Sequence, residues 1–421
     1  MKKTIVVLST LLALFLVFLT VRSLVLDGRQ DPLAAAAEAL RAVPAPEPEP
    51  ESPPEPAWSP PARGNPLLLL DSEQIESELD RILEKHGAVG AQVALIHDGE
   101  VAGSYAYGWA TMYSDPMTTD HKIRIASVSK VIVGMAAMLL QEDGVVDVDE
   151  DIGKYWDTTA RNPLYPDNPI TIRTILNHTS TIANYSNDFP SAATIRSRLS
   201  YAYLSAEPGS LENWCYNNYA FQVLGSTLEV ASDRILDDIL NEKLFDPLEI
   251  DASFANGDLE NTDLLATLYR GNTVEMSVGT QKSLHLYQIP GESCIFYAGG
   301  LTISAEDLAK LVCLLANDGV FQNRRLLQSR SVELMETYSD QPLADGTYQA
   351  LPLLYVPKIY GRDGIYFHPG AAYGVYSLIS YDPETGDGVV ILTTGADSAA
   401  DRYGIYNVCD EINEYVYRIL R

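Results

Sequence analysis

The spacing of apolar side chains changes along the chain, and each change predicts an element. Residues 71–86 carry apolar side chains at helical spacing, among them Ile75 and Leu79, and predict an amphipathic helix that Gly87 ends. The next two apolar stretches, 91–97 and 100–107, flank Asp98-Gly99. Because Asp-Gly is a strong hairpin signal, we expect two paired antiparallel strands there.

Strand patterns return near the C-terminus. We expect strands at 366–368, 373–381 and 388–394, the last two joined by the turn 382–386, and then a closing helix over 402–420. The middle of the chain, from about residue 127 to residue 338, is predicted to be mostly helical. The simplest assembly is an α/β (α+β) fold, with a mixed sheet built from both ends of the chain and a helical region inserted between them.

The N-terminus has a different character. Met1-Lys2-Lys3 precedes a charge-free, mostly apolar run at 4–21, which is typical of an export signal and reaches the short end of a membrane span. Charged residues follow this run, and small residues come late. We therefore expect residues 1–30 to be an uncleaved signal anchor, in preference to a cleaved signal peptide. The two lysines would then stay in the cytoplasm. The expected location is the cell membrane with an extracellular head, or secretion if the segment is cleaved.

A linker rich in proline and glutamate occupies residues 31–66. Proline fixes φ and lacks the backbone donor, so the stretch at 43–61 is expected to be a stiff, extended spacer. The globular head would then comprise residues 67–421, and its length suits one large domain or two.

Charge and cysteine content exclude several functions. The net charge of −28 argues against nucleic acid as a partner and disfavours a polybasic grip on lipid. Four cysteines are too few for a disulfide-built scaffold. Cys313 and Cys409 are expected to be buried, and a disulfide between Cys215 and Cys294 stays open. Neither a metal-binding spacing nor a phosphate-binding glycine loop is present, so no cofactor and no metal are expected.

The strongest chemical signal is Ser127 followed three residues later by Lys130, at the start of a predicted helix. Positions i and i+3 share one helical face, so the amine can reach the hydroxyl. A neighbouring base is one of the few ways to activate a serine, and this S-x-x-K spacing occurs in serine β-lactamases and penicillin-binding proteins. Taken alone, the pair is also compatible with an ordinary solvated helix start.

Further motifs follow in order. Taken together, they resemble the class C β-lactamase and penicillin-binding-protein superfamily of serine hydrolases, from about Ile75 to the C-terminus. That family reads S-x-x-K, then Y-x-N, then K-T-G or a variant such as H-x-G. The matching stretches here are Tyr216-Asn217-Asn218, His368-Pro369-Gly370, the segment 170–180 with its His178-Thr179-Ser180, and the segments 298–301 and 304–310.

The resemblance implies a β-lactamase/transpeptidase-like fold, with an antiparallel sheet flanked by helices, an inserted all-helical region and a cleft between them. Ser127 would be the nucleophile, and Lys130 its base or a charged donor that holds it. Tyr216 would exchange a proton with the serine or the leaving group, although a phenol is a poor base unless Lys130 and His368 lower its pKa. Asn218 would orient Lys130 and a substrate carbonyl.

His368 stands where β-lactamases carry lysine. A mostly neutral histidine gives weaker capture of a carboxylate, which disfavours β-lactam binding. Gly370 would let the strand edge approach the substrate, and Ala371 would supply the second oxyanion N–H beside that of Ser127. We expect His178 to be a packed structural histidine.

These expectations define an exported serine hydrolase that acts through an acyl-enzyme on an amide, peptide or ester bond. A D-alanyl-D-alanine carboxypeptidase-like or related D-specific peptidase comes first, and its small-molecule or peptide substrate would include the peptidoglycan stem peptide. The alternatives are an esterase or β-lactamase of the same fold, and a non-catalytic domain that binds wall fragments or acts as a scaffold. Specificity is expected from loops around the cleft, such as 269–293 and 340–363.

Overall fold

The computed structural model describes residues 72–185 and 189–420. The predicted anchor at 1–30 and the predicted linker at 31–66 lie outside this range. Within the described range, no helix combines the length and the apolar character that a membrane span requires.

Eight of the described strands form one sheet in the order β10-β11-β12-β13-β14-β1-β2-β3. Every neighbouring pair is antiparallel. The N-terminal hairpin therefore joins the C-terminal strands through β1 and β14, with Val93 opposite Ile391. The strands are β1 (Gly90–His97), β2 (Glu100–Thr111), β3 (Asp115–Pro116), β10 (Tyr348–Gln349), β11 (Leu354–Val356), β12 (Ile365–Ala372), β13 (Val375–Tyr381) and β14 (Gly388–Thr394).

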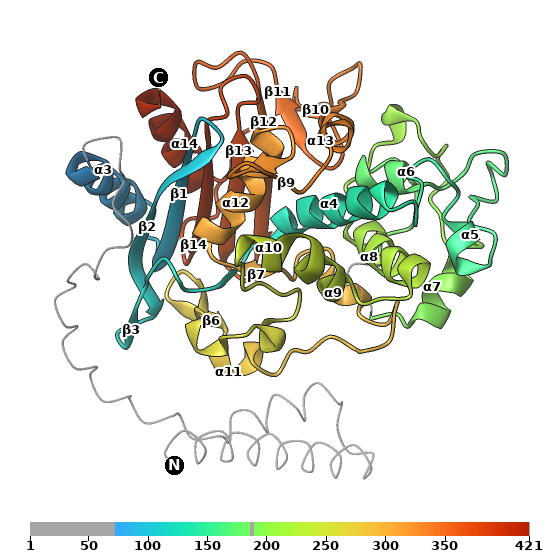
Figure 1. Cartoon of the computed structure of the whole chain (residues 1–421), viewed down its shortest axis with the longest axis horizontal. Helices are drawn as coiled ribbons and strands as arrows, with labels where there is room; N and C mark the ends of the chain where they lie inside the picture. Colours follow the sequence, from blue (N-terminus) through green and yellow to red (C-terminus); the bar gives the residue numbers. More distant parts are fainter. Residues whose placement is uncertain (1–71, 186–188, 421) are drawn as a thin grey trace, which may run out of the picture. The chain divides into compact units, whose positions relative to one another are not determined.

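Both faces of this sheet are covered. On one face, α3 (Ser72–Lys85) and α14 (Asn407–Ile419) pack against each other and against the sheet, and Figure 1 shows them side by side. On the other face lies α12 (Ala305–Ala316). Val93 and Leu95 of β1 point into the core beneath α3 and α14, whereas Ala94 and Ile96 belong to the second core. The strand is consequently apolar from Val93 to Ile96 instead of alternating.

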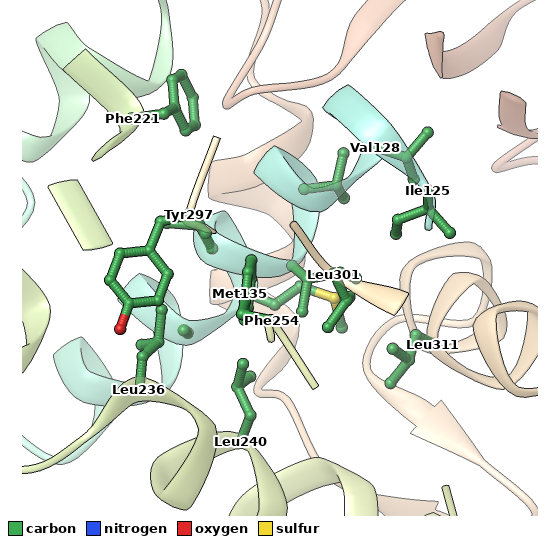
Figure 2. Close-up of a cluster of buried hydrophobic side chains, with 14 of the residues drawn as sticks. Ile125, Val128, Met135, Phe221, Leu236, Leu240, Phe254, Tyr297, Leu301 and Leu311 are labelled. Carbon is green, nitrogen blue, oxygen red and sulfur yellow. The ribbon is translucent and has the colours of Figure 1, made fainter. Parts of the chain in front are cut away.

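The second core surrounds α4 (Ser129–Glu142), which extends from the sheet into the helical region (Figure 1). Residues Ser129 to Leu140 of this helix are all buried. Met135 lies at its centre, among side chains from several elements (Figure 2). The remaining α-helices of the described residues are α5 (Gly153–Trp156), α6 (Ile172–Leu176), α7 (Ala192–Arg198), α8 (Asn218–Ser232), α9 (Leu236–Leu240), α10 (Asp246–Leu248), α11 (Val278–Gln281) and α13 (Ser329–Glu336), and the π-helical turn η3 (Asn241–Phe245) lies between α9 and α10.

The fold confirms most of the predicted elements and corrects others. The helix at the start of the head, the hairpin at Asp98-Gly99 and the three C-terminal strands are present. Asp98 and Gly99 both have positive φ angles, as a tight hairpin turn requires. All neighbouring strands of the eight-stranded sheet are antiparallel. This confirms the antiparallel sheet that the family resemblance implies and corrects the mixed sheet expected from the element pattern. The region 127–338 also holds short paired strands. β5 (Leu268–Arg270) pairs with β6 (Thr273–Met276), β8 (Val320–Phe321) pairs with β9 (Arg324–Arg325), and β7 (Thr302–Ile303) pairs with β4 (Ile123–Arg124), which lies just before the region.

Two further corrections concern the end of the chain and the cysteines. The closing helix begins at Asn407 instead of residue 402, because the Asp401 carboxylate accepts the backbone N–H groups of Tyr403 and Ile405 and holds a turn there. The four cysteines, all within the described residues, are free thiols. Cys215 is exposed and Cys294 is buried, so the open question of a disulfide between them is answered by two separate thiols.

Helix α8 is fixed by a close contact at Gly225. A Cβ placed there would stand 2.3 Å from ring atoms of Tyr297, whose hydroxyl donates to the buried carboxylate of Glu229. We expect Gly225→Ala to lower the free energy of unfolding by about 1–3 kcal/mol, the usual cost of overpacking. Gly279→Ala is the matched control, because its Cβ would meet only Ser277 Oγ at 3.9 Å, and it should change stability by less than about 0.5 kcal/mol. Urea unfolding measures both variants, and equal stability of the two would contradict the expectation.

Candidate active site

Ser127 lies in a short 3₁₀ turn, Ala126–Val128, which leads directly into α4. The preceding residue, Ala126, has φ +50°, a left-handed conformation that is unusual for a residue with a side chain. Such strained turns persist only where the surrounding structure holds them. The hydroxyl of Ser377 provides part of that support, because it donates to the carbonyl of Ile125 at 2.7 Å.

Lys130 is the group that gives this turn a chemical function. Its side chain is completely buried, with its Nζ 3.0 Å from Ser127 Oγ and 2.6 Å from the carbonyl oxygen of Ala298. Burial lowers the pKa of Lys130 to about 7. A large share of the amine is therefore neutral near pH 7. A neutral amine can donate one proton to Ala298 while its lone pair accepts the proton of Ser127.

Strand β12 approaches the serine turn very closely at Gly370. A Cβ at this position would stand 2.3 Å from Ser377 Oγ, 2.7 Å from the Ile125 carbonyl oxygen and 3.1 Å from the backbone nitrogen of Ser127. No residue with a side chain fits without moving the strand. Glycine at this place in the H-x-G motif therefore allows the sheet to meet the nucleophile, in addition to the expected approach of a substrate.

A cavity of about 360 Å³ opens over Ser127. It brings together six of the seven site residues that the sequence predicts, and the seventh, Lys130, lies beneath it. The lining residues are Ser127, His178, Trp214, Tyr216, Asn218, Leu343, Asp345, Gln349, Pro352, Leu354, His368, Pro369, Gly370, Ala371, Tyr403, Gly404 and Tyr406.

Tyr216 stands across the cavity from the sheet. Its hydroxyl lies near that of Ser127, and its ring lies 5.0 Å from Lys130 Nζ. Although 38% of the residue is exposed, its phenol end is surrounded by protein, and this burial raises the pKa of Tyr216 above its ordinary value. The possibility that Lys130 and His368 lower this pKa is not realised. Tyr216 therefore keeps its proton at neutral pH and can donate it.

His368 is held neutral. Its Nδ1 lies 2.8 Å from the carbonyl oxygen of Pro369, so Nδ1 carries the proton and Nε2 presents a lone pair. Burial, reinforced by the nearby Lys130 amine, lowers the pKa of His368 to about 3. The residue in the lysine position of the third motif thus brings no positive charge to the cavity.

Asn218 and Ala371 line the cavity beside Ser127, Asn218 as the first residue of α8. The amine of Lys130 is held by the carbonyl of Ala298, a contact that sequence reasoning missed although the segment 298–301 matched a family phrase. His178 was expected to be only structural, yet it lines the cavity.

The predicted specificity loops contribute unequally. Loop 340–363 supplies Leu343, Asp345, Gln349, Pro352 and Leu354 to the cavity wall, whereas none of the described lining residues comes from 269–293. The turn 401–406 contributes Tyr403 and Tyr406 to the cavity wall instead. Within the described residues, no group of three or more His, Cys, Asp and Glu side chains is placed to hold a metal ion.

In this site the buried amine of Lys130 contacts Ser127, which faces the cavity, and the hydroxyl of Tyr216 lies near the same serine. This arrangement defines a serine hydrolase site of the S-x-x-K type. The profile of the Beta-lactamase family matches residues 75–408, and the chain belongs to this family. Members of this fold are serine hydrolases that act on amide, peptide or ester bonds, and the chain is an enzyme of that class.

Three known proteins show the range of its relatives. Penicillin-binding protein 4 of Amycolatopsis lactamdurans is 24% identical over 337 residues, which cover 77% of this chain and 86% of that protein. The D-aminopeptidase of Brucella anthropi is 28% identical over 219 residues, 48% of this chain and 40% of that protein. The structure of a D-amino acid amidase from Ochrobactrum anthropi, in complex with L-phenylalanine, superposes with a TM-score of 0.63 at 23% identity and covers 82% of this chain and 97% of its own.

The lowered pKa of Lys130 predicts a specific pH dependence. Because the neutral amine accepts the serine proton, the rate at which a fluorophosphonate labels Ser127 should rise about tenfold per pH unit below pH 7 and level off above it. Intact-mass kinetics between pH 5 and pH 9 measure this rate. Lys130→Met, which fills the same buried space without an amine, should label slowly at every pH. If the midpoint of the rate against pH lay near the pKa of an exposed lysine, Lys130 would not be a base whose pKa is lowered by burial.

Proposed function

We propose that the protein hydrolyses small amide or peptide substrates through an acyl-enzyme on Ser127. The observation that carries this proposal is the 3.0 Å contact between Ser127 Oγ and the buried amine of Lys130. In the proposed cycle Lys130 takes the serine proton as Ser127 attacks the carbonyl. The N–H groups of Ser127 and Ala371 hold the oxyanion, and Tyr216 protonates the departing amine as the proton held by Lys130 passes to Tyr216, so both groups return to their starting states. Water then attacks the acyl carbonyl and gives one proton back to Ser127 Oγ as the acyl–oxygen bond breaks, which releases the acid.

The charges around the cavity favour a substrate without a carboxylate next to the scissile bond. Among the described lining residues, Asp345 carries the only formal charge, since His178 and His368 are held neutral. Arg402 is nearby, but its guanidinium stacks 4.4 Å from the ring centre of Tyr403 and is not part of the lining. A C-terminal carboxylate would thus meet a carboxylate and no cation among the described lining residues.

Of the D-specific peptidases, we therefore favour an aminopeptidase or amidase over a carboxypeptidase. Asp345 together with the aromatic rings of Trp214, Tyr403 and Tyr406 suits a free ammonium group and an apolar side chain. The names of two relatives, a D-aminopeptidase and a D-amino acid amidase, support this choice. An esterase is the second candidate, because the neutral His368 does not discriminate between an ester and an amide.

We further propose that the enzyme works outside the cytoplasm, attached through residues 1–30 and carried by the spacer at 31–66. The support is the two lysines before the apolar run at 4–21 and the run of proline and glutamate that follows. The domain limits 1–30, 31–66 and 67–421 belong to the same proposal. A cell-wall peptide would be within reach of such a head.

The proposal is tested first by covalent labelling of the full chain. We expect a fluorophosphonate or a fluorescent penicillin to add one mass equivalent to the wild type and none to Ser127→Ala. Ser129→Ala is the matched control, because Ser129 lies two residues away, is fully buried and bonds the backbone of Leu301. Labelling that persists in Ser127→Ala would overturn the assignment, and a folded wild type that resists both probes would favour the non-catalytic binding domain.

The preference for an amine is tested at Asp345. We expect a D-amino acid p-nitroanilide with a free amine to be hydrolysed with a higher kcat/KM than its N-acetyl derivative. Asp345→Asn should shrink this ratio by about 1.4-fold to fivefold, because a solvent-accessible ion pair contributes about 0.2–1 kcal/mol. Asp340→Asn, an acidic change in the same loop outside the cavity lining, is the control. An unchanged ratio in Asp345→Asn would remove this residue from amine recognition.

A further inference from the structure

His178 occupies an unusual position for a packed histidine. It follows α6 in a left-handed conformation with φ +59°, only 3% of its surface is exposed, and it lines the cavity over Ser127. Its ring centre lies 4.5 Å from that of Tyr216 and 5.1 Å from that of Phe221. A strained and buried polar residue at a catalytic cavity calls for a reason beyond packing.

His178 accepts two hydrogen bonds, one from the residue on each side of Tyr216. The backbone N–H of Cys215, just before the tyrosine, donates to the His178 carbonyl at 3.0 Å. The N–H of Asn217, just after it, donates to His178 Nδ1 at 3.2 Å. The ring of His178 packs against the Tyr216 ring between these two bonds. His178 therefore contacts the residue before Tyr216, the residue after it and the ring of Tyr216 itself.

The second of these bonds also fixes the protonation state of the ring. Because Nδ1 accepts a backbone N–H, the single ring proton sits on Nε2. Protonation would turn Nδ1 into a donor and break the bond to Asn217. The surroundings oppose that change, because burial and the nearby Lys130 and His368 hold the pKa of His178 well below its ordinary value. Nε2 itself is buried and has no hydrogen-bond partner among the described residues.

We propose that His178 is a positioning residue for the reaction, whose Nδ1 and carbonyl fix the backbone on both sides of Tyr216 so that the phenol hydroxyl stays on Ser127. This inference rests on the proposed hydrolase function, in which Tyr216 protonates the departing amine. It predicts that loss of the Nδ1 contact harms only those steps that need the tyrosine proton. A histidine that merely filled space would affect all steps alike.

Three variants separate these roles. In His178→Asn the side-chain oxygen can stand near the place of Nδ1, and asparagine tolerates the left-handed conformation. In His178→Gln the amide reaches toward the place of Nε2 instead. His178→Gly meets the same φ without strain but has no acceptor. All three keep the backbone carbonyl that binds Cys215, and thermal unfolding shows whether each variant is folded.

The decisive measurement compares two leaving groups on one acyl group. An alkylamide needs a proton on its departing amine, whereas a p-nitrophenyl ester leaves without one. We expect His178→Gly and His178→Gln to lose at least tenfold in kcat on the amide and less than threefold on the ester, with KM nearly constant. His178→Asn should retain most of the amide activity. Equal losses on both substrates, or equal losses in the Asn and Gln variants, would overturn the inference.

A double-variant cycle with Tyr216→Phe completes the test. If His178 acts through Tyr216, adding His178→Gly to Tyr216→Phe should cost little further amide activity, whereas additive losses would contradict the proposal. Fluorophosphonate labelling of each variant distinguishes a failure of the proposed hydrolase function from a failure of the positioning role of His178. A wild type that neither labels nor hydrolyses overturns the hydrolase function and this inference with it. A labelled wild type whose leaving-group ratio does not change in His178→Gly overturns this inference alone.

Discussion

The chemistry of this protein depends on the removal of water from one amine. Lys130 lies in the first turn of a helix that is buried on all sides from Ser129 to Leu140, and its Nζ lies within hydrogen-bonding distance of the Ala298 carbonyl and the Ser127 hydroxyl. An ammonium ion is costly in such surroundings, so the proton is released near neutral pH instead of near pH 10. The second core is needed for this effect, because α4 is buried completely where the sheet and the helical region enclose it.

A second constraint joins the sheet to that helix. The nucleophile turn is tied to β13 through Ser377 and is approached by β12 at Gly370, at a distance that no side chain could occupy. Ser127 is consequently positioned by the sheet, while the helical region supplies Asn218 as the first residue of α8 and Tyr216 two residues before it. The cavity lies along this seam. Its residues, far apart in sequence, meet because the two parts of the head pack against each other around one strained turn.

The sequence predicted the parts of this arrangement that depend on local patterns. The helix before Gly87, the turn at Asp98-Gly99 and the three ordered motifs all have signals of their own, and all seven predicted site residues lie in or beneath one cavity. What it could not predict are contributions made through the backbone. The Ala298 carbonyl and the bond from the Cys215 N–H to the His178 carbonyl have no residue-type signature, because any residue offers a carbonyl and nearly any an N–H. The same holds for the turn 401–406, which interrupts an apolar pattern typical of a helix.

Desolvation also explains why Lys130 and Tyr216 have opposite roles in proton transfer. The burial that lowers the pKa of Lys130 raises that of Tyr216, because in each case the charged form is disfavoured. At neutral pH the amine can therefore accept a proton and the phenol can give one, without any further charged group. His368 follows the same rule and stays neutral, so the cavity holds no fixed cation that would select a carboxylate. A lysine in its place would need to keep its charge in equally dry surroundings, next to the amine of Lys130. The neutral histidine avoids that repulsion, and we infer that it thereby directs the family's shared chemistry away from acidic substrates.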